Sequence, residues 1–183
     1  MKITILNGNP DLSNRDFDRY LETLQEALED GGHAVTCMTL RDLNLHYCNG
    51  CFGCWVKTPG ECLARDDSGG VRRAVIGSDL TVFASPLVMG FVSALTKKMM
   101  DKMIPLLHPY IVFDRGEMHH LARYKRYPQL GLLLQKTIGS DDEDLALASE
   151  IVSRTAINFK SKLCFTKLIE EPIQEVVNEI NHI

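Results

Sequence analysis

The sequence predicts a three-layer α/β/α sandwich, with helices on both faces of a five-stranded parallel sheet. Short, almost wholly apolar runs alternate with longer segments whose apolar residues recur at helical spacing. Strands that are apolar throughout are buried on both faces, which is typical of a parallel sheet. The chain of 183 residues is long enough for one well-cored domain and too short for two ordinary ones, so residues 1–183 are expected to form a single domain.

The five expected strands are short apolar runs, and polar or turn-forming residues follow them. They are residues 2–6, 34–40, 80–84, 131–135 and 163–166. Asn-Gly-Asn-Pro follows the first run and Ser-Pro follows the third, and both are typical of strand ends. Because open α/β sheets bind ligands beyond the carboxyl ends of their strands, these loops are the first place to look for a site.

Five helices are expected between and after the strands. The first begins at Ser13 or Asn14 and ends at Gly31-Gly32, with apolar residues on one face. That face consists of Phe17, Tyr20, Leu21, Leu24, Ala27 and Leu28. The later helices are expected over residues 68–76, from the third strand to residue 107, and over residues 141–159 and 172–180.

Residues 108–128 fit neither pattern and form an insertion that is expected to be irregular. A loop of this length in a small domain is either a cover for the active site or a dimer contact. Its basic side chains could bind the pyrophosphate of a nicotinamide cofactor, although a solvated dimer contact is the preferred interpretation. These side chains are Arg115, His119, His120, Arg123, Lys125 and Arg126. A homo-oligomer, either a dimer or a tetramer, is therefore expected.

Composition excludes several classes of protein. The hydrophobic fraction of 45% and the charged fraction of 24% are those of a soluble globular protein. A net charge of −4 argues against nucleic-acid binding, and no apolar run approaches the roughly 20 residues of a membrane span. The first residues do not resemble a signal peptide, so a cytoplasmic location is expected. Six cysteines in a reducing compartment are not expected to form structural disulfides.

Four of the six cysteines fall within fifteen residues, in the pattern C-x2-C-x2-C-x7-C. They are Cys48, Cys51, Cys54 and Cys62. Thiolates at this spacing hold a soft metal centre or perform redox chemistry, and a compact triplet is more typical of an iron–sulfur cluster than of zinc. The alternative is that they are free cysteines. Cys37 and Cys164 lie in apolar runs and are expected in the core.

Several motifs occur in a specific order over the first hundred residues. They are G-N-P…S-N at residues 8–14, C-N-G-C-F-G-C-W and T-P-G-E-C at 48–62, D-D at 66–67, S-P at 85–86, S-A at 93–94, Lys97 and Asp101. Together they resemble the flavodoxin-like NAD(P)H-dependent FMN reductase family, and in particular its iron–sulfur flavoprotein branch. This resemblance implies a flavodoxin-like sheet with strand order 2-1-3-4-5. Lys97 and Asp101, one helical turn apart, are expected to pair with each other.

The resemblance implies two contacts with FMN. The first loop would hold the phosphate, and the loop after the third strand would lie along the flavin ring, with Trp55 or Phe91 as an aromatic contact. The phosphate residues would be Asn9, Ser13, Asn14 and Arg15, and the ring residues Pro86, Leu87, Val88, Met89 and Gly90. Ser13 and Asn14 would serve equally well as an ordinary helix cap.

The first loop departs from the family pattern. Asn9, Asp11 and Arg15 stand where the family usually has a serine, a basic residue and a threonine. The carboxylates of Asp11, Asp16 and Asp18 would oppose a phosphate dianion, which Arg15 could partly offset.

The function implied is an FMN-dependent oxidoreductase that passes electrons from NAD(P)H to a small-molecule or protein acceptor. A [4Fe–4S] cluster on the four cysteines would deliver single electrons to a redox protein. The seven residues between Cys54 and Cys62 exceed the gap in cluster-bearing members, which favours a plain flavoprotein. The alternative of a different class is a non-catalytic module that lacks FMN and uses the cysteine loop to bind metal (Fe–S or Zn) or a partner.

Overall fold

A computed structural model describes residues 1–114 and 116–183, so the expectation for Arg115 lies outside the described residues. The main sheet contains five parallel strands in the order β2-β1-β3-β7-β8, and short β4 pairs antiparallel with β3. The bounds are β1 (Lys2–Asn7), β2 (Ala34–Thr39), β3 (Leu80–Val88), β4 (Phe91–Val92), β7 (Gln129–Gln135) and β8 (Leu163–Leu168). Numbered among the parallel strands alone, this is the expected order 2-1-3-4-5.

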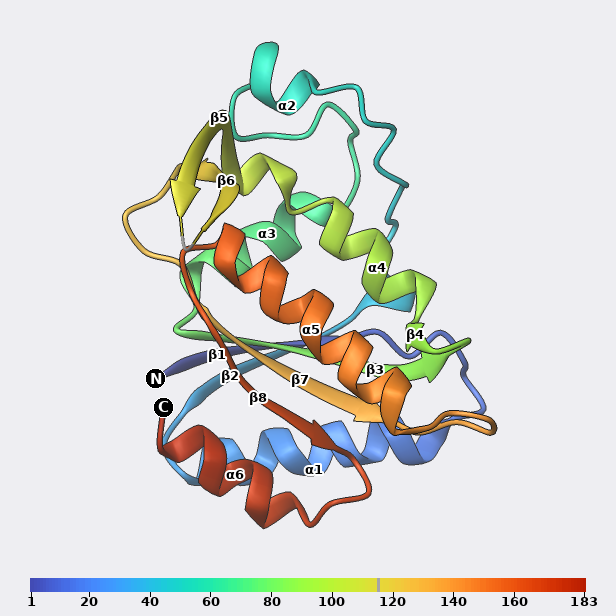
Figure 1. The fold of residues 1–183 in the computed structure, drawn as a ribbon. Coiled ribbons are helices and arrows are strands. Elements are labelled where there is room, and N and C mark those ends of the chain that lie inside the picture. Colours follow the sequence, from blue (N-terminus) through green and yellow to red (C-terminus); the bar gives the residue numbers. More distant parts are fainter. Residues whose placement is uncertain (115) are drawn as a thin grey trace.

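Helices cover both faces of the sheet, which confirms the expected three layers (Figure 1). One layer contains α1 (Arg15–Asp30) and α6 (Ile173–Asn181). The other contains α3 (Ser68–Gly77), α4 (Ala94–Asp101) and α5 (Asp142–Asn158). Each layer encloses its own apolar core against the sheet, because every strand of a parallel sheet presents apolar side chains to both faces. Cys37 and Cys164, expected in the core, are half-buried against it.

The third strand is longer than expected because it does not end at Ser85-Pro86. Pro86 lies opposite Gln135 of β7, and β3 continues to Val88 before a tight turn leads into β4. Proline lacks a backbone N–H but readily adopts extended backbone, so it is tolerated near the end of a strand. The structure thus extends the predicted loop of residues 85–90 into a short hairpin.

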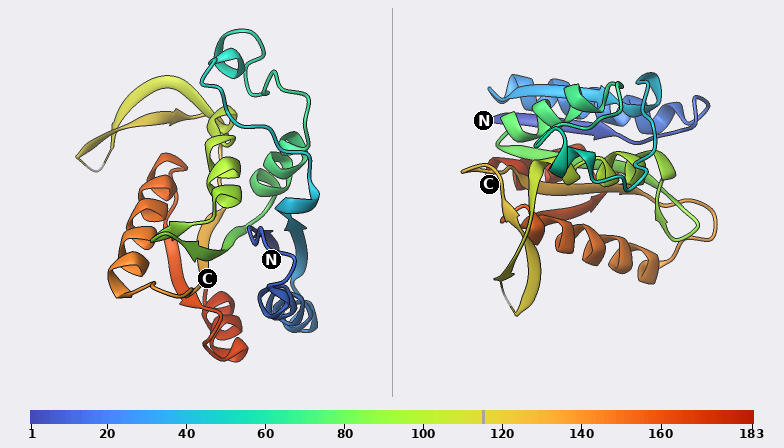
Figure 2. Two further views of the ribbon diagram at one scale, coloured as in Figure 1. Left: turned by 90° about the vertical axis from the view of Figure 1, so that its right-hand side faces the viewer. Right: turned by 90° about the horizontal axis from the view of Figure 1, so that it is seen from above.

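The insertion expected to be irregular over residues 108–128 is instead mostly regular. A 3-10 turn, η2 (Ile104–Leu106), leads into β5 (Leu107–Asp114), which pairs antiparallel with β6 (Glu117–Ala122). We call this hairpin the arm, residues 107–122. It projects from the three layers (Figure 2). Exposed and less exposed positions alternate over Ile111–Asp114, but polar and apolar residues do not, so the sequence carries no period-two pattern here.

Two short elements complete the fold, namely η1 (Leu40–Asp42) and α2 (Gly53–Val56). The cysteine loop, residues 48–62, carries α2 and lies at the far end of the helical layer from the sheet (Figure 1). No helix in the described part of the chain is sufficiently long and apolar to span a membrane.

Candidate functional site

The loops that follow β1 and β3 meet at the carboxyl edge of the sheet. The Gly8 backbone N–H donates to the Ala84 carbonyl at 2.8 Å, and the Ser93 hydroxyl donates to the Gly8 carbonyl at 2.6 Å. A Cβ on Gly8 would lie 1.8 Å from Oγ1 of Thr96, so no larger residue fits without a shift. Glycine is therefore required for this close approach of the first loop to α4.

The loop after β7 joins the same edge. The Thr137 hydroxyl donates to the Leu87 carbonyl at 2.6 Å. The Asn14 side-chain amide donates to Oε1 of Gln135 at 2.6 Å, so Asn14 does not cap α1 with its side chain. The ends of three neighbouring strands, β1, β3 and β7, are thus held together by direct hydrogen bonds.

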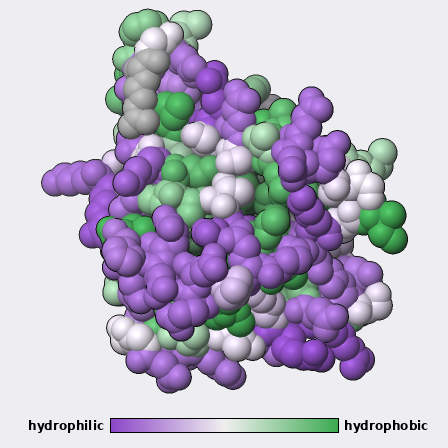
Figure 3. All heavy atoms as spheres, turned by 60° about the horizontal axis from the view of Figure 1, so that its bottom comes forward, coloured by the Kyte–Doolittle hydropathy of each residue, from purple (hydrophilic) through white to green (hydrophobic). Residues whose placement is uncertain are grey.

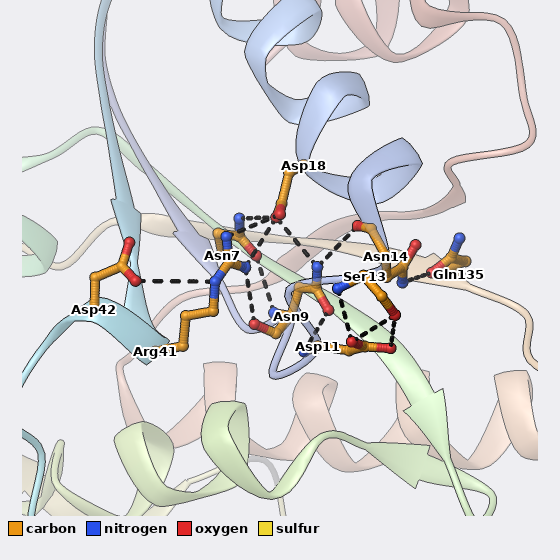
Figure 4. Close-up of polar contacts among 9 residues, drawn as sticks. All are labelled: Asn7, Asn9, Asp11, Ser13, Asn14, Asp18, Arg41, Asp42 and Gln135. Carbon is orange, nitrogen blue, oxygen red and sulfur yellow. Dashed lines mark hydrogen bonds and ion pairs between the residues drawn. The ribbon is translucent and has the colours of Figure 1, made fainter.

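The Asp11 carboxylate binds Ser13 in the loop just ahead of α1 (Figure 4). The Ser13 backbone N–H donates to Oδ1 of Asp11 at 2.8 Å, and the Ser13 hydroxyl lies 2.7 and 2.8 Å from the two carboxylate oxygens. These hydrogen bonds, from the side chain first and the backbone second, lower the pKa of Asp11. A side chain of the chain itself therefore fills the place expected for a ligand anion.

Asn9, predicted to face the phosphate, is fully buried at 0% exposure and serves the loop itself. Its amide group donates to the Asn14 carbonyl at 3.1 Å and to Oδ1 of Asp18 at 3.2 Å. Its own Oδ1 accepts from the Asp11 backbone N–H at 3.0 Å. The Asn9 side chain therefore fixes the loop's shape rather than offering donors to a ligand.

Arg41, which the sequence analysis did not consider, is the partner of Asp18. The guanidinium donates to Oδ2 of Asp18 at 2.8 Å and to the Asn9 carbonyl at 3.1 Å. Burial alone would raise the pKa of Asp18, yet hydrogen bonds from Arg41, Asn7 and Asn9 together lower it. Arg41 follows β2, next to β1 in the sheet, and a lone arginine at a strand end was the only sequence signal for it.

The residues predicted to line the flavin ring divide into two groups. Pro86 and Leu87 are buried, and Leu87 belongs to the core. Val88 is exposed and Met89 is fully exposed at 100%, at the tip of the turn from β3 to β4. Met89 and Gly90 both have positive φ, 52° and 77°, as a two-residue hairpin turn requires. Of the five predicted ring residues, those at 88–90 therefore present the exposed surface.

Trp55 does not lie near that turn. Its indole N–H donates to the Leu107 carbonyl at 2.9 Å, and its ring stacks on Phe52 with centroids 5.3 Å apart. Leu107 follows the carboxyl end of α4, whereas the 88–90 turn precedes its amino end. Eight helical residues rise about 12 Å, so the structure does not bring Trp55 to the predicted ring site.

The four clustered cysteines line one cavity of about 220 Å³, together with Tyr47 and Lys102. Cys48 and Cys51 are exposed, Cys54 is buried and Cys62 is half-buried. Burial raises the pKa of the Cys54 thiol, and the neighbouring cysteines add to this effect. Within residues 1–114 and 116–183, no three His, Cys, Asp or Glu side chains are grouped so that they could hold a metal ion. As folded, the thiols do not fit a [4Fe–4S] cluster.

A buried ion pair lies beneath this cavity. Nζ of Lys102 is 2.7 Å from Oδ2 of Asp66, and their side chains are 1% and 0% exposed. Nζ also lies 3.8 Å from Sγ of Cys62. Burial would raise the pKa of Asp66, but hydrogen bonds from Lys102, Ser68 and the His46 backbone hold it well below its usual range. Lys102 was not singled out from the sequence, because its partner lies 36 positions away.

Two arginines of residues 108–128, Arg123 and Arg126, have partners within the chain. The Arg123 guanidinium donates to the carbonyls of Pro105 and Leu107, at 3.0 and 3.1 Å. Arg126 pairs with Asp79. These contacts support the segment itself. Outside this segment, the expected pairing of Lys97 with Asp101 is confirmed at 2.5 Å.

Comparison with known proteins agrees with this architecture. Residues 1–120 match the model of the NADPH-dependent FMN reductase family. An iron-sulfur flavoprotein of Archaeoglobus fulgidus is 34% identical over 88% of this chain and 82% of its own length. An iron-sulfur flavoprotein of Methanocaldococcus jannaschii is 30% identical over 58% of this chain and 53% of its own.

Two solved structures share the fold at low sequence identity. An azoreductase from Bacillus anthracis superposes with a TM-score of 0.65 at 13% identity, covering all of both chains. An NAD(P)H:quinone oxidoreductase from Methanothermobacter marburgensis gives a TM-score of 0.65 at 18% identity, over 99% of this chain and 93% of that one. The family match, the relatives and the shared fold together show that this chain belongs to the NADPH-dependent FMN reductase family and is an FMN-dependent oxidoreductase with NAD(P)H as its donor.

Proposed function

We propose that this protein binds FMN at the carboxyl edge of its sheet and passes electrons from NAD(P)H to a small-molecule acceptor. The observation that supports this most is the joining of three strand ends by the hydrogen bonds of Gly8, Asn14 and Thr137. Ligands of open α/β sheets bind at such an edge. The exposed turn at Val88 and Met89 provides an apolar surface beside it.

The two ends of this edge differ in how they suit FMN. The turn of residues 88–90 is exposed and suits a planar aromatic ring, whereas the backbone and hydroxyl donors of Ser13, just ahead of α1, are taken by Asp11. Bound FMN would supply the electron-transfer chemistry. The protein's part is to position the ring and exclude side reactions, and hydride transfer needs no general acid or base from the side chains at this edge.

The test is consumption of reduced nicotinamide by protein reconstituted with FMN, with a quinone or an azo dye as acceptor. We expect turnover with at least one of NADH and NADPH. A Thr137→Val variant, which removes the hydroxyl that bonds to the Leu87 carbonyl, should lower the rate by loosening the edge. Lys97→Ala, on the exposed side of α4, is the matched control and should leave the rate unchanged. Absence of turnover with both nicotinamides would contradict the proposal.

A second candidate is an iron–sulfur flavoprotein with a redox protein as acceptor. Its support is the 34% identity to an iron-sulfur flavoprotein and the single cavity that the four cysteines share. Because the thiols as folded do not fit a cluster, the plain flavoprotein is preferred over this candidate. Anaerobic reconstitution followed by iron and sulfide analysis distinguishes them, since a cubane needs about four iron atoms per chain. Fewer than about one iron per chain would eliminate the second candidate.

We also propose that the protein is a homodimer through the arm. An isolated two-stranded hairpin is marginally stable in water, yet this one exposes large apolar side chains. They are Tyr110, Ile111, Phe113, Met118 and Leu121. Figure 3 shows hydrophobic atoms among hydrophilic ones at the projecting end of the molecule. A second copy of the chain would bury this surface, which aromatic residues and methionine are suited to form.

Sedimentation tests the dimer. The wild-type protein should be dimeric at micromolar concentration, and a Phe113→Ser/Met118→Ser variant should be monomeric with unchanged helix content. A control double variant, Leu147→Ser/Ile151→Ser, removes exposed apolar side chains from α5 instead and should remain dimeric. A monomeric wild-type protein would refute this interface.

We further propose a cytoplasmic location. Its support is the six free cysteines, since in an oxidising compartment closely spaced thiols form disulfides. Fractionation of cells that express the protein, followed by detection in the soluble fraction, would test this location.

A further inference from the structure

We propose that Asp11 is an internal competitor for the phosphate of FMN, and that its carboxylate must leave Ser13 before the phosphate can bind the backbone and hydroxyl donors of Ser13, just ahead of α1. This inference rests on the flavin site proposed above and identifies the residue that limits FMN affinity there. The loop that was expected to bind the FMN phosphate already holds an anion of its own, the Asp11 carboxylate.

Five backbone donors of the first loop are bonded within the chain. The N–H of Ser13 donates to Oδ1 of Asp11, and those of Asn9 and Asp11 donate to side-chain oxygens of Asn7 and Asn9. The N–H of Asn14 donates to the Asp11 carbonyl at 3.2 Å, and that of Arg15 to the Ser13 carbonyl at 2.9 Å. The Ser13 N–H and hydroxyl lie just ahead of α1, so a phosphate gains these two donors only by displacing Asp11.

The Ser13 hydroxyl strengthens the hold of Asp11 on Ser13. It lies within 2.8 Å of both oxygens of Asp11, so one carboxylate uses both the backbone and the side-chain donor of the same residue. A phosphate would use the same pair of donors. Hydrogen bonds to a charged acceptor are stronger than neutral ones, so the internal carboxylate is an effective competitor.

The charges around the loop favour the arrangement in which Asp11 is bonded to Ser13. The guanidinium of Arg41 pairs with Asp18, so the charge of Arg41 is already balanced within the loop. Asp16 pairs with Arg19 on the exposed face of α1. A dianion that approaches Ser13 while Asp11 is in place therefore meets a carboxylate there, which the exposed Arg15 at the start of α1 offsets only in part.

Asp11 is also the carboxylate that can leave. It is exposed, and its side chain bonds only to Ser13 two positions away. Asp18, in contrast, is partly buried and bonds to Arg41, Asn7 and Asn9. Rotation of the Asp11 side chain would free the Ser13 donors without disturbing the core, whereas movement of Asp18 would break the loop.

The comparison of FMN with riboflavin isolates this effect, because the two ligands differ only by the phosphate. In the Asp11→Asn variant we expect the affinity for FMN to rise about tenfold or more, as expected when a charge-assisted competitor becomes neutral. The affinity for riboflavin should change by less than about threefold. Asp16→Asn is the matched control, since it removes the same charge nearby but has no bond to Ser13.

Titrations that follow the fluorescence of the flavin itself give the affinities for FMN and for riboflavin. Thermal unfolding shows that each variant is folded. A rise in FMN affinity with Asp11→Asn and not with Asp16→Asn supports the proposal. Equal rises in both variants would mean general electrostatics and would overturn it. Riboflavin and FMN binding that are both unchanged by Asp11→Asn would overturn it while leaving the flavin site intact. Failure of every variant to bind either flavin would instead refute the proposed flavin site, and the inference with it.

Discussion

Replacement of Asp66 by asparagine should destabilise the protein severely. The substitution keeps the shape of the side chain and removes the charge that balances Lys102. Because both side chains are almost completely buried, the ammonium would remain in the interior with Sγ of Cys62, 3.8 Å away, as its other neighbour. Removal of one partner from a buried ion pair costs about 3–5 kcal/mol. That is a large fraction of the 5–15 kcal/mol by which domains are typically stable.

The reverse substitution should cost less. Lys102→Met removes the cation and keeps an apolar chain of similar length, while Asp66 retains hydrogen bonds from Ser68 and from the His46 backbone N–H. The double variant Asp66→Asn/Lys102→Met should lose less stability than the sum of the two single variants, since the second change removes the charge that the first leaves unpaired.

The effect of Asp66→Asn should also depend on pH. The pKa of Asp66 is depressed in the folded protein, so its stabilising contribution is present above the unfolded pKa of about 3.9 and is lost as the pH falls through the folded value. The difference between wild type and variant should therefore be constant from neutral pH to about pH 5 and shrink below about pH 4.

Urea unfolding at 25 °C, followed by circular dichroism with the thiols kept reduced, measures these free energies. A loss smaller than about 1 kcal/mol for Asp66→Asn would refute the argument, because that is the value of an exposed pair. So would a larger loss for Lys102→Met than for Asp66→Asn, or strict additivity in the double variant.

Three further predictions concern the carboxyl edge of the sheet. Gly8→Ala should destabilise the fold by about 1–3 kcal/mol in the same urea assay, since its Cβ would lie 1.8 Å from Oγ1 of Thr96, and Thr96→Ala should partly restore the loss. Ser13→Ala should weaken FMN binding in the Asp11→Asn background, where a phosphate would use the hydroxyl, and should leave riboflavin binding unchanged; equal losses for both flavins would place the phosphate elsewhere. Trp55→Phe should leave FMN affinity unchanged within about twofold by fluorescence titration, since the indole bonds to Leu107 beyond the far end of α4. A large loss would mean that this ring reaches the flavin.

Sequence patterns anticipated the strands and most helices because burial leaves a local signature. The run after Met1 and the stripe from Phe17 to Leu28 could be recognised without knowledge of any partner. The arm was missed because it is only half-buried and its polar and apolar residues do not alternate. The resemblance of the motifs correctly placed the chain in its family, since their order is preserved over the first hundred residues.

The details of the site depended on contacts that no local pattern records. The departure of Asp11 from the family pattern was visible in the sequence. Its hydrogen bonds with Ser13 could be recognised only from the conformation of the loop. Asn14 was expected to cap α1 or hold the phosphate, yet its amide bonds to Gln135, 121 positions away. Trp55 was assigned to the flavin from the resemblance, and the structure places it beyond the other end of α4.

The sequence alone determined the layers, the strand order through its family resemblance and the clustering of four cysteines. Only the tertiary structure decided which polar groups are already bonded within the chain. The physical reason is that apolar periodicity reports which face of an element is buried, at separations of two to four residues. Hydrogen bonds and ion pairs are instead decided by distances between elements, as for Lys102 and Asp66, and such distances exist only once the chain has folded.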